Sequence, residues 1–190
     1  MMSGQFSLFE PPAPVLPPGF RYAPELVSPD AERALLEAFA TYPFAAFEFR
    51  GFLGQRRTAS FGWRYDFGAS ALREAAPVPS ELLPLREQAA AFAGLETEEL
   101  PHVLVTEYTP GAAIGWHRDR PEFGEVIGVS LASACTFRFR RKAGAGWERR
   151  SLELQPRSAY LLRGASRTEW EHSIPGVDAL RFSVTFRALR

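Results

Sequence analysis

The chain has 190 residues with 22 basic and 22 acidic side chains, so its formal net charge at neutral pH is zero. This balance removes the strong overall positive field that draws many proteins to nucleic acids. The apolar fraction of 46% is that of a globular protein, and no apolar run approaches the about 20 residues that a membrane-spanning helix needs. We therefore expect one domain, no membrane segment and a monomer.

The N-terminal residues are rich in proline. Five prolines lie within residues 11–18, where they disfavour helix and central strand. We expect a flexible tail over residues 1–19 and a single folded domain over residues 20–190. The first residues lack the basic segment and the long apolar segment of a secretory signal, which favours a cytoplasmic location.

Two helices are expected between residues 20 and 100. In the first, over residues 28–42, Ser28 can cap the N-terminus, Pro29 suits the first helical position, and apolar residues recur at 31, 35, 36 and 39. The second covers residues 80–95, with Ser80 as its cap and Gly94 at its end. We expect both helices to pack on the outside of a β core.

Short β-rich segments dominate the chain from Pro101 onward. They are separated by Gly, Pro and Asp and cover residues 101–108, 125–131, 134–141, 147–154, 158–163, 170–174 and 179–187. An earlier pair, residues 44–52 and 58–67, is expected to form two strands joined by a turn around Gly54. The pattern predicts an α+β, mainly β fold in which helices precede a β-sandwich or barrel.

Two chemically capable side chains are interpreted as structural. Cys135, the single cysteine, lies in an apolar segment and is expected to be a small core residue rather than a nucleophile. One cysteine also excludes an internal disulfide and a cysteine-rich zinc site. His102 begins an apolar strand, and we interpret it as a core or edge residue.

The final strand alternates between apolar and polar side chains. In LRFSVTFR, residues 180–187, the polar face carries Arg181, Ser183, Thr185 and Arg187. The backbones of the two arginines lie about 20 Å apart at roughly 3.3 Å per residue. Their long side chains could address opposite ends of one small anionic ligand, or the polar face could simply be solvated.

A pair of metal-ligating side chains lies in GWHRDRP, residues 115–121. In an extended segment His117 and Asp119 project to the same side, with Arg118 opposite. His172 is the candidate third ligand, because a β-sandwich can bring distant residues together. Two histidines and one carboxylate form the facial triad of non-heme Fe(II) oxygenases, and a zinc hydrolase is the chemical rival.

The order of motifs resembles the AlkB family of Fe(II)/2-oxoglutarate dioxygenases. The matching residues are TEYTPG at 106–111, HRD at 117–119, EHS at 171–173 and RFSVTFR at 181–187. The resemblance implies a double-stranded β-helix, or jelly roll, over residues 101–190. It also implies a catalytic Fe(II) held by His117, Asp119 and His172.

The resemblance also implies a site for the cosubstrate 2-oxoglutarate. Arg181 would pair with its distal carboxylate, with Tyr108 donating a hydrogen bond nearby, while Arg187 would hold the cosubstrate or orient a metal ligand. Thr106 and Ser183 stand where many members have Asn, and both can still donate hydrogen bonds. The implied reaction uses O₂, decarboxylates 2-oxoglutarate and hydroxylates an N-alkyl carbon, releasing an aldehyde.

The implied substrates are alkylated bases of DNA or RNA, as in DNA repair. Residues 55–67, QRRTASFGWRYDF, are similar to the nucleotide-recognition segment of the family, so Arg57 and the alternating Trp63, Tyr65 and Phe67 are candidate substrate contacts. An aromatic core face is the alternative. Pro121 stands where repair members usually carry an acidic residue that reads the damaged base.

Two further segments bear on partners. Residues 138–150 hold six basic side chains against Glu148, in a hairpin that falls where some DNA-acting members touch the duplex, although a solvated face is the alternative. Residues 5–9, QFSLF, resemble the peptide by which bacterial DNA enzymes dock on the sliding clamp, through Gln5, Leu8 and Phe9. The same tail could instead pack on its own domain.

Three hypotheses follow from the sequence. The first is a dioxygenase that dealkylates nucleic-acid bases. The second is an oxygenase of the same fold that acts on a protein or a small molecule, as zero net charge and Pro121 allow. The third is a non-catalytic β-sandwich binding module.

Overall fold

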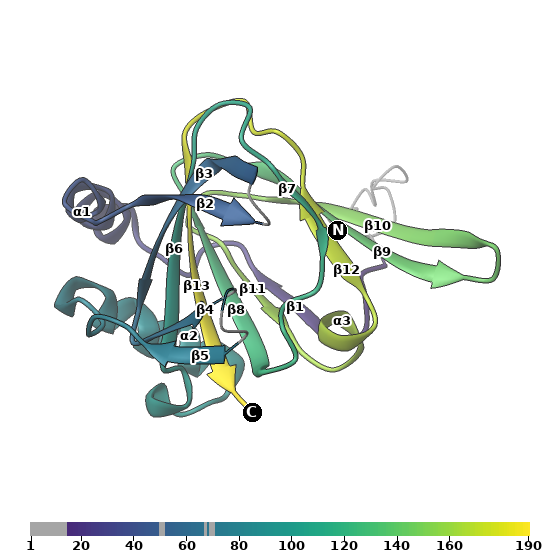
Figure 1. The fold of residues 1–190 in the computed structure, drawn as a ribbon, viewed down its shortest axis with the longest axis horizontal. Helices are drawn as coiled ribbons and strands as arrows, with labels where there is room; N and C mark the ends of the chain where they lie inside the picture. The colour runs from purple at the N-terminus through teal and green to yellow at the C-terminus, as the bar shows by residue number, and fades with distance from the viewer. Residues whose placement is uncertain (1–14, 50–51, 67, 69–70) are drawn as a thin grey trace, which may run out of the picture.

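The computed structural model describes residues 15–49, 52–66, 68 and 71–190, and three antiparallel sheets organise them (Figure 1). The seven-stranded sheet has the order β1 (Phe20–Ala23), β11 (Ala159–Leu162), β8 (Phe123–Leu131), β13 (Arg181–Leu189), β6 (His102–Tyr108), β3 (Phe52–Phe61) and β2 (Ala45–Phe49). The four-stranded sheet has the order β10 (Gly146–Leu154), β9 (Cys135–Ala143), β12 (Glu171–Ile174) and β7 (Ile114–His117). A small third sheet pairs β4 (Trp63–Asp66) with β5 (Ala71–Glu74). The mainly β architecture is therefore confirmed.

Two helices cover the outer face of the seven-stranded sheet. Helix α1 (Pro29–Phe39) begins after Ser28, whose side chain accepts a hydrogen bond from the Ala31 N–H at 3.2 Å. Helix α2 (Leu83–Ala93) follows the 3₁₀ turn η1 (Ser80–Leu82) and ends at Gly94, whose φ of 67° is left-handed. A second 3₁₀ turn, η2 (Thr97–Glu99), leads into β6. The described part of the chain holds no helix long and apolar enough to span a membrane.

Two apolar cores stabilise the fold, one on each side of the seven-stranded sheet. The outer core packs Leu35 and Phe39 of α1, with residues of α2, against Phe182, Val184 and Phe186 of β13. The inner core lies where the two large sheets face each other and is formed by Cys135, Phe137, Phe139, Tyr160, Leu162 and Trp170 among others. Cys135 is 7% exposed, which confirms its expected place in the core.

The alternation predicted for the last strand is confirmed, but its polar face is not solvated. Phe182, Val184 and Phe186 point to the helices, while the polar side chains of β13 point into the space between the sheets. Arg181 is fully buried and Ser183 is 5% exposed. A polar strip this deeply buried needs partners, because an unpaired buried polar group is costly.

The structure differs from expectation in the first hairpin. Gly54 lies inside β3, and Phe49 pairs with Phe52, so Gly54 is not in the connection between the two strands; residues 50–51 lie outside the described residues. The segment expected as one strand over 58–67 is broken at Gly62, whose φ is 71°. A Cβ there would lie 2.0 Å from the Pro101 carbonyl oxygen, so the close approach of these two segments of the chain requires glycine.

Five short elements escaped prediction. They are β1, β5, β7, the 3₁₀ turn η2 and the four-residue helix α3 (Ala165–Thr168). Residues just before β1 already pack on the domain, since Pro17 is buried and the Pro18 carbonyl accepts a hydrogen bond from the Ser166 N–H at 2.9 Å. Most of the expected tail, with its docking peptide, lies in residues 1–14, outside the described residues.

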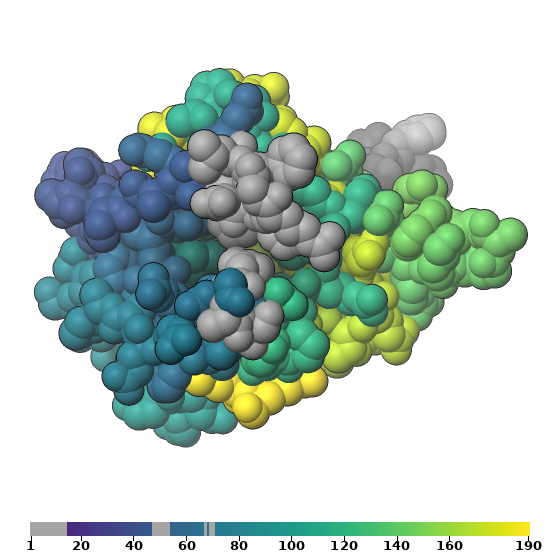
Figure 2. All heavy atoms as spheres, viewed as in Figure 1, coloured from purple at the N-terminus to yellow at the C-terminus, as the bar shows by residue number. Residues whose placement is uncertain are grey.

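The arginine-rich segment forms the predicted hairpin. Strands β9 and β10 pair from Cys135 with Leu154 to Ala143 with Gly146. The hairpin projects from the body of the molecule, in green at the right of the space-filling view (Figure 2).

Candidate metal centre and cosubstrate site

Two neighbouring strands of the four-stranded sheet bring His117 and His172 together. The two residues are directly opposite each other in the pairing of β7 with β12, and their ring centroids lie 4.3 Å apart. Asp119 follows just after β7, and one ligand atom from each of the three residues lies within 4.8 Å of the others. Among the described residues, no other group of His, Cys, Asp and Glu meets this condition. The three predicted ligands can therefore hold one metal ion.

The protonation states of the three side chains suit metal binding. Burial lowers the pKa of His117, and burial together with His117 lowers the pKa of His172 to about 3, so both imidazoles are neutral. The Nδ1–H of His117 donates to the Gly115 carbonyl at 2.9 Å, which leaves Nε2 free as a ligand atom. Burial alone would raise the pKa of Asp119, but Arg187, the histidines and Arg167 outweigh it and hold this pKa well below its usual range. A charged carboxylate and neutral imidazoles are the forms that bind a metal.

Arg187 holds the carboxylate of Asp119 in place. Its Nε donates to Asp119 Oδ1 at 2.8 Å, and both side chains are nearly buried. On its other side, Arg187 Nη1 donates to His102 Nδ1 at 3.4 Å. Burial, with Arg187 nearby, lowers the pKa of His102 well below its usual value, so the ring is neutral and can accept this bond. Of the two roles implied for Arg187, the geometry favours orienting a metal ligand.

Sequence reasoning missed the part that His102 plays here. The strand pairing places His102 opposite Arg187, and its ring also packs on Phe123 at 4.8 Å between centroids. His102 is thus a core residue, as expected, but it also supports the arginine that orients Asp119. Only the register of β6 against β13 could have revealed this, and the sequence does not specify that register.

Arg181 lies at the opposite end of the same strip. Its Nε donates to Ser130 Oγ at 3.1 Å, and its guanidinium carbon lies 5.0 Å from the centre of the Tyr108 ring. Its Nη1 is buried and has no hydrogen-bond partner among the described residues. A buried guanidinium with an unused N–H is a ready site for a carboxylate.

The side chains between the two arginines are small and polar. Ser183 lies opposite Thr106 on one side and Ser130 on the other, and its Oγ is 3.5 Å from Thr185 Oγ1. Burial raises the pKa of Tyr108, so its phenol stays protonated and can donate a hydrogen bond. The inner face of β13 and its neighbours therefore carries a row of buried polar side chains from Arg181 to Asp119, which we call the polar channel, with groups suited to a carboxylate at one end and to a metal at the other.

Comparison with known proteins identifies the kind of enzyme to which this channel belongs. Residues 19–187 match the family model described as the 2OG-Fe(II) oxygenase superfamily. The chain belongs to this superfamily. The oxygenase therefore uses Fe(II), 2-oxoglutarate and O₂, and the zinc hydrolase and the non-catalytic module are set aside.

Two relatives of the oxygenase carry the name ALKBH8. The chain is 27% identical to an "Alkylated DNA repair protein ALKBH8 homolog" of Arabidopsis thaliana, covering 91% of this chain and 56% of the relative. It is also 27% identical to the Mus musculus protein "tRNA (carboxymethyluridine(34)-5-O)-methyltransferase ALKBH8", covering 84% of this chain and 24% of that protein. The chain thus spans about half of the first relative and a quarter of the second.

A solved structure has the same fold. The structure of OsALKBH1 superposes with a TM-score of 0.69 at 15% identity, covering 92% of this chain and 98% of that one. The oxygenase therefore shares the fold of this AlkB homologue, and the expected jelly-roll core is confirmed.

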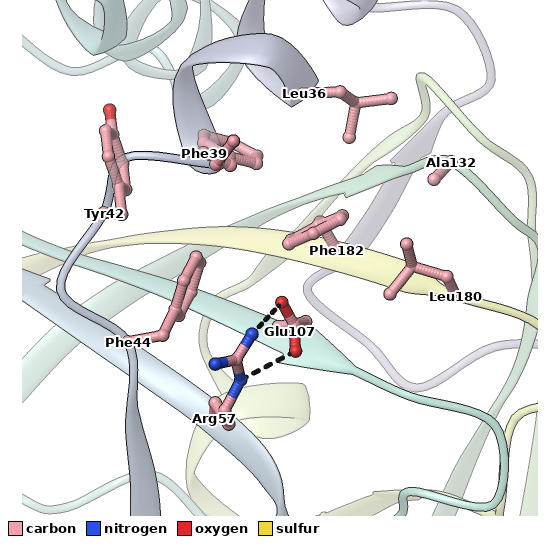
Figure 3. A pocket seen from close by; sticks show the side chains of 10 residues that line it. Leu36, Phe39, Tyr42, Phe44, Arg57, Glu107, Ala132, Leu180 and Phe182 are labelled. Carbon is pink, nitrogen blue, oxygen red and sulfur yellow. Dashed lines mark hydrogen bonds and ion pairs between the residues drawn. The ribbon is translucent and has the colours of Figure 1, made fainter.

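One predicted substrate contact lies outside the channel. Arg57 points to the outer face of the sheet, where its Nε and Nη2 donate to the two carboxylate oxygens of Glu107 at 2.9 and 2.8 Å (Figure 3). The pair borders a cavity of about 310 Å³ between α1 and the sheet, with Phe44 and Phe182 among its apolar walls. Arg57 thus lies on the face of the sheet opposite the metal ligands, because neighbouring residues of a strand face opposite sides, and its contact with the substrate stays a prediction.

Arg56, its neighbour, points to the inner side instead. Its Nη1 donates to the Ala113 carbonyl at 3.3 Å, close to the start of β7. Burial lowers the pKa of Arg56, with Tyr108 opposing that effect. The alternation of side chains along β3 would have predicted that Arg56 faces inward, if the sequence had shown that the strand ends just before Gly62.

Of the three aromatic residues predicted to contact the substrate, the structure describes Trp63 and Tyr65. Tyr65 lies in β4 beneath Arg120, whose guanidinium carbon is 4.4 Å from the ring centre. Because Arg120 directly follows Asp119, Tyr65 borders the metal-binding loop. Trp63 is half-buried and shares the Tyr65 side of β4 by alternation, and Phe67 lies outside the described residues.

Proposed function

We propose that this AlkB-like oxygenase removes alkyl groups oxidatively from bases of DNA or RNA, with His117, Asp119 and His172 as its iron ligands. The observation that carries the proposal is the buried polar channel, which has the three ligand side chains at one end and the unpaired Nη1 of Arg181 at the other. When bound, iron and 2-oxoglutarate supply O₂ activation, so that 2-oxoglutarate becomes succinate and CO₂ while an N-alkyl carbon is hydroxylated and leaves as an aldehyde.

The residues of the chain bind and orient the reacting groups. Arg181, with Ser130 and Tyr108 beside it, would pair with the distal carboxylate of 2-oxoglutarate, and Thr106 and Ser183 would line its path. Arg187 keeps the Asp119 carboxylate charged and turned toward the histidines. The burial of this channel limits water around the reacting groups.

A basic and aromatic face supports a nucleic-acid substrate. It comprises Arg138, Arg140 and Lys142 of β9 with Trp116 and Trp147, and we call it the ladder. Arg140 lies 4.6 Å from the Trp116 ring and 4.1 Å from the Trp147 ring, and Lys142 lies 4.5 Å from Trp147. Trp116 directly precedes His117 in β7 and therefore lies on the opposite face of that strand, so the ladder covers the outer face of the four-stranded sheet. Local positive charge attracts phosphates even when the whole chain is neutral.

The names of the relatives support the same substrate class, since one is called a repair protein for alkylated DNA and another a tRNA methyltransferase. Tyr65 and Trp63 are candidates for stacking on the target base, and Phe67 remains a prediction. Arg56 takes the place of Arg57 in this proposal, because it faces the channel.

A turnover screen tests the proposed reaction. The protein is incubated without oxygen with Fe(II), 2-oxoglutarate and methylated DNA or RNA oligonucleotides, and air then starts the reaction. Aldehyde and succinate should form in equal amounts, and Asp119→Ala should form neither. Succinate without aldehyde from any oligonucleotide would instead favour a protein or small-molecule substrate.

Salt-dependent binding tests the ladder. Each phosphate that a basic side chain neutralises adds about 1 to the slope of log affinity against log salt. Arg138→Gln with Lys142→Gln should therefore flatten the slope, while Arg33→Gln, on the exposed face of α1, should not. Equal slopes for the parent, the double variant and Arg33→Gln would show that the ladder does not contact the nucleic acid.

We also propose that the N-terminal residues Gln5, Leu8 and Phe9 dock on a bacterial sliding clamp, and that the protein is a cytoplasmic monomer. The support for docking is the QFSLF sequence, which places two adjacent apolar anchors in a proline-rich tail. A peptide of residues 1–15 should bind the clamp, and Leu8→Ala with Phe9→Ala should abolish binding. Equal binding by both peptides would refute the docking proposal.

A further inference from the structure

Arg167 is a buried arginine that none of the sequence motifs includes. It lies in α3 and is only 5% exposed. Its guanidinium donates four hydrogen bonds, all to main-chain carbonyl oxygens: Asp119 at 3.2 Å, Arg120 at 2.6 Å, Phe123 at 2.7 Å and Gly124 at 2.9 Å. All four acceptors belong to one segment, which runs from the end of β7 into β8.

This arrangement is unusual for a buried charge. No carboxylate of the described residues lies within ion-pair distance of Arg167, although most buried charges are paired. Its desolvation is instead offset by the carbonyl dipoles, and burial still lowers its pKa. The N–H groups of a guanidinium form a planar fork, so four bonds fix the positions of four carbonyls relative to one another.

The segment that Arg167 holds carries Asp119. Arg187 fixes the carboxylate of this residue, while Arg167 fixes its backbone carbonyl. A further hydrogen bond joins the two segments in the other direction: Arg118 Nη1 donates to the Thr168 carbonyl at 3.0 Å. Five residues after Arg167 the chain reaches His172 in β12. Arg167 therefore ties the segment of one candidate ligand to the segment of another.

We infer that Arg167 is a positioning residue, which sets the affinity and coordination geometry of the metal by fixing the backbone of Asp119 relative to His172. This inference rests on the proposed role of Asp119 as a metal ligand. The guanidinium of Arg167 donates only to main-chain carbonyls and to no side chain of the three candidate ligands. A lysine at this position could not make the same bonds, since it has one nitrogen and no fork.

Cobalt binding tests the inference without turnover. Co(II) is stable in air, and its visible absorption bands report the geometry of its ligands. For Arg167→Lys and Arg167→Met we expect a Co(II) Kd weaker by roughly tenfold to a hundredfold, the usual effect of losing a residue that supports a ligand. We also expect altered absorption bands at saturating Co(II). The matched control is Arg163→Lys, whose side chain binds Glu125 and the Ala93 carbonyl instead of the Asp119 segment.

Asp119→Ala separates failure of this inference from failure of the proposed function. If Asp119→Ala binds Co(II) as the parent does, the proposed ligand set is wrong. If Asp119→Ala loses binding while both Arg167 variants keep the parental Kd and absorption bands, Arg167 has no positioning role. Circular dichroism reports whether each variant is folded, and Arg167→Lys decides the question if Arg167→Met unfolds. Parental Kd and bands in Arg167→Lys alone are then sufficient to overturn the inference.

Discussion

Gly128 lies on the inner face of the seven-stranded sheet, where a side chain would clash with a neighbouring ring. It lies in β8 directly opposite Tyr160 of β11, and the Tyr160 ring lies across it. A Cβ built on Gly128 would be 2.2 Å from Tyr160 Cζ and 2.4 Å from its hydroxyl oxygen. Carbon atoms in contact are about 3.5 Å apart, so the ring would have to move by roughly 1 Å.

The ring has little room to move. Its centroid lies 4.7 Å from that of Phe137 and 6.2 Å from that of Phe20, both in the inner core. Inserting a methyl group into such a core costs about 1–3 kcal/mol. We expect Gly128→Ala to lower the free energy of unfolding by this amount in urea titrations at constant slope.

Two further variants make the reasoning refutable. Gly115→Ala is the matched control, since nothing lies within 4 Å of its Cβ position, and it should change stability by less than about 0.5 kcal/mol. In a Tyr160→Ala background the clash is gone, so Gly128→Ala should then cost almost nothing. If Gly128→Ala costs the same with and without the Tyr160 ring, the ring is not what excludes a side chain at this position.

Three other outcomes are expected. Arg181→Met should raise the KM for 2-oxoglutarate by about tenfold to a hundredfold, since a hydrogen bond to a charged group contributes about 1.5–3 kcal/mol, while leaving urea stability equal or higher; unchanged KM would place the cosubstrate elsewhere. Arg57→Ala should lower stability only slightly, because the Arg57 side chain is half-exposed in its pair with Glu107, and should leave aldehyde formation intact, which steady-state kinetics measure. The metal-free protein should lose stability as the pH falls below 6.5, because histidines of the unfolded chain bind protons near that pH. In the folded protein burial lowers the pKa of His172 to about 3 and the pKa of His102 well below its usual value, so both stay neutral there. Urea titrations at pH 7 and 5 should therefore show a smaller effect of pH for His102→Gln, and an identical effect would contradict the neutral state of His102.

The metal site could be predicted from sequence because its chemistry is local. His117 and Asp119 share one short extended segment, and the alternation of residues 181–187 marks two arginines on one polar face. The side of Arg57 could not be predicted in this way. Which of two adjacent arginines faces inward depends on where Gly62 interrupts β3, and that break lies where Pro101 approaches from a distant part of the chain.

Arg167 was beyond sequence reasoning for a different reason. Its partners are main-chain carbonyls, which any residue provides, so no pattern of side chains marks its role. The strand β7 was missed because only four residues form it, between the turn at Gly111 and the metal-binding segment. Long-range pairing with β12 is what defines it as a strand.

The alternation of β13 separates what keeps this enzyme folded from what makes it react. Phe182, Val184 and Phe186 serve the helix-covered core, while Arg181 and Arg187, on the opposite face, serve the channel. Laboratory evolution can therefore work on the two sets independently. Substitutions of one apolar residue by another at the outward positions should change the thermal stability. Substitutions at the inward positions should change which carboxylate cosubstrate binds, while the fold stays the same.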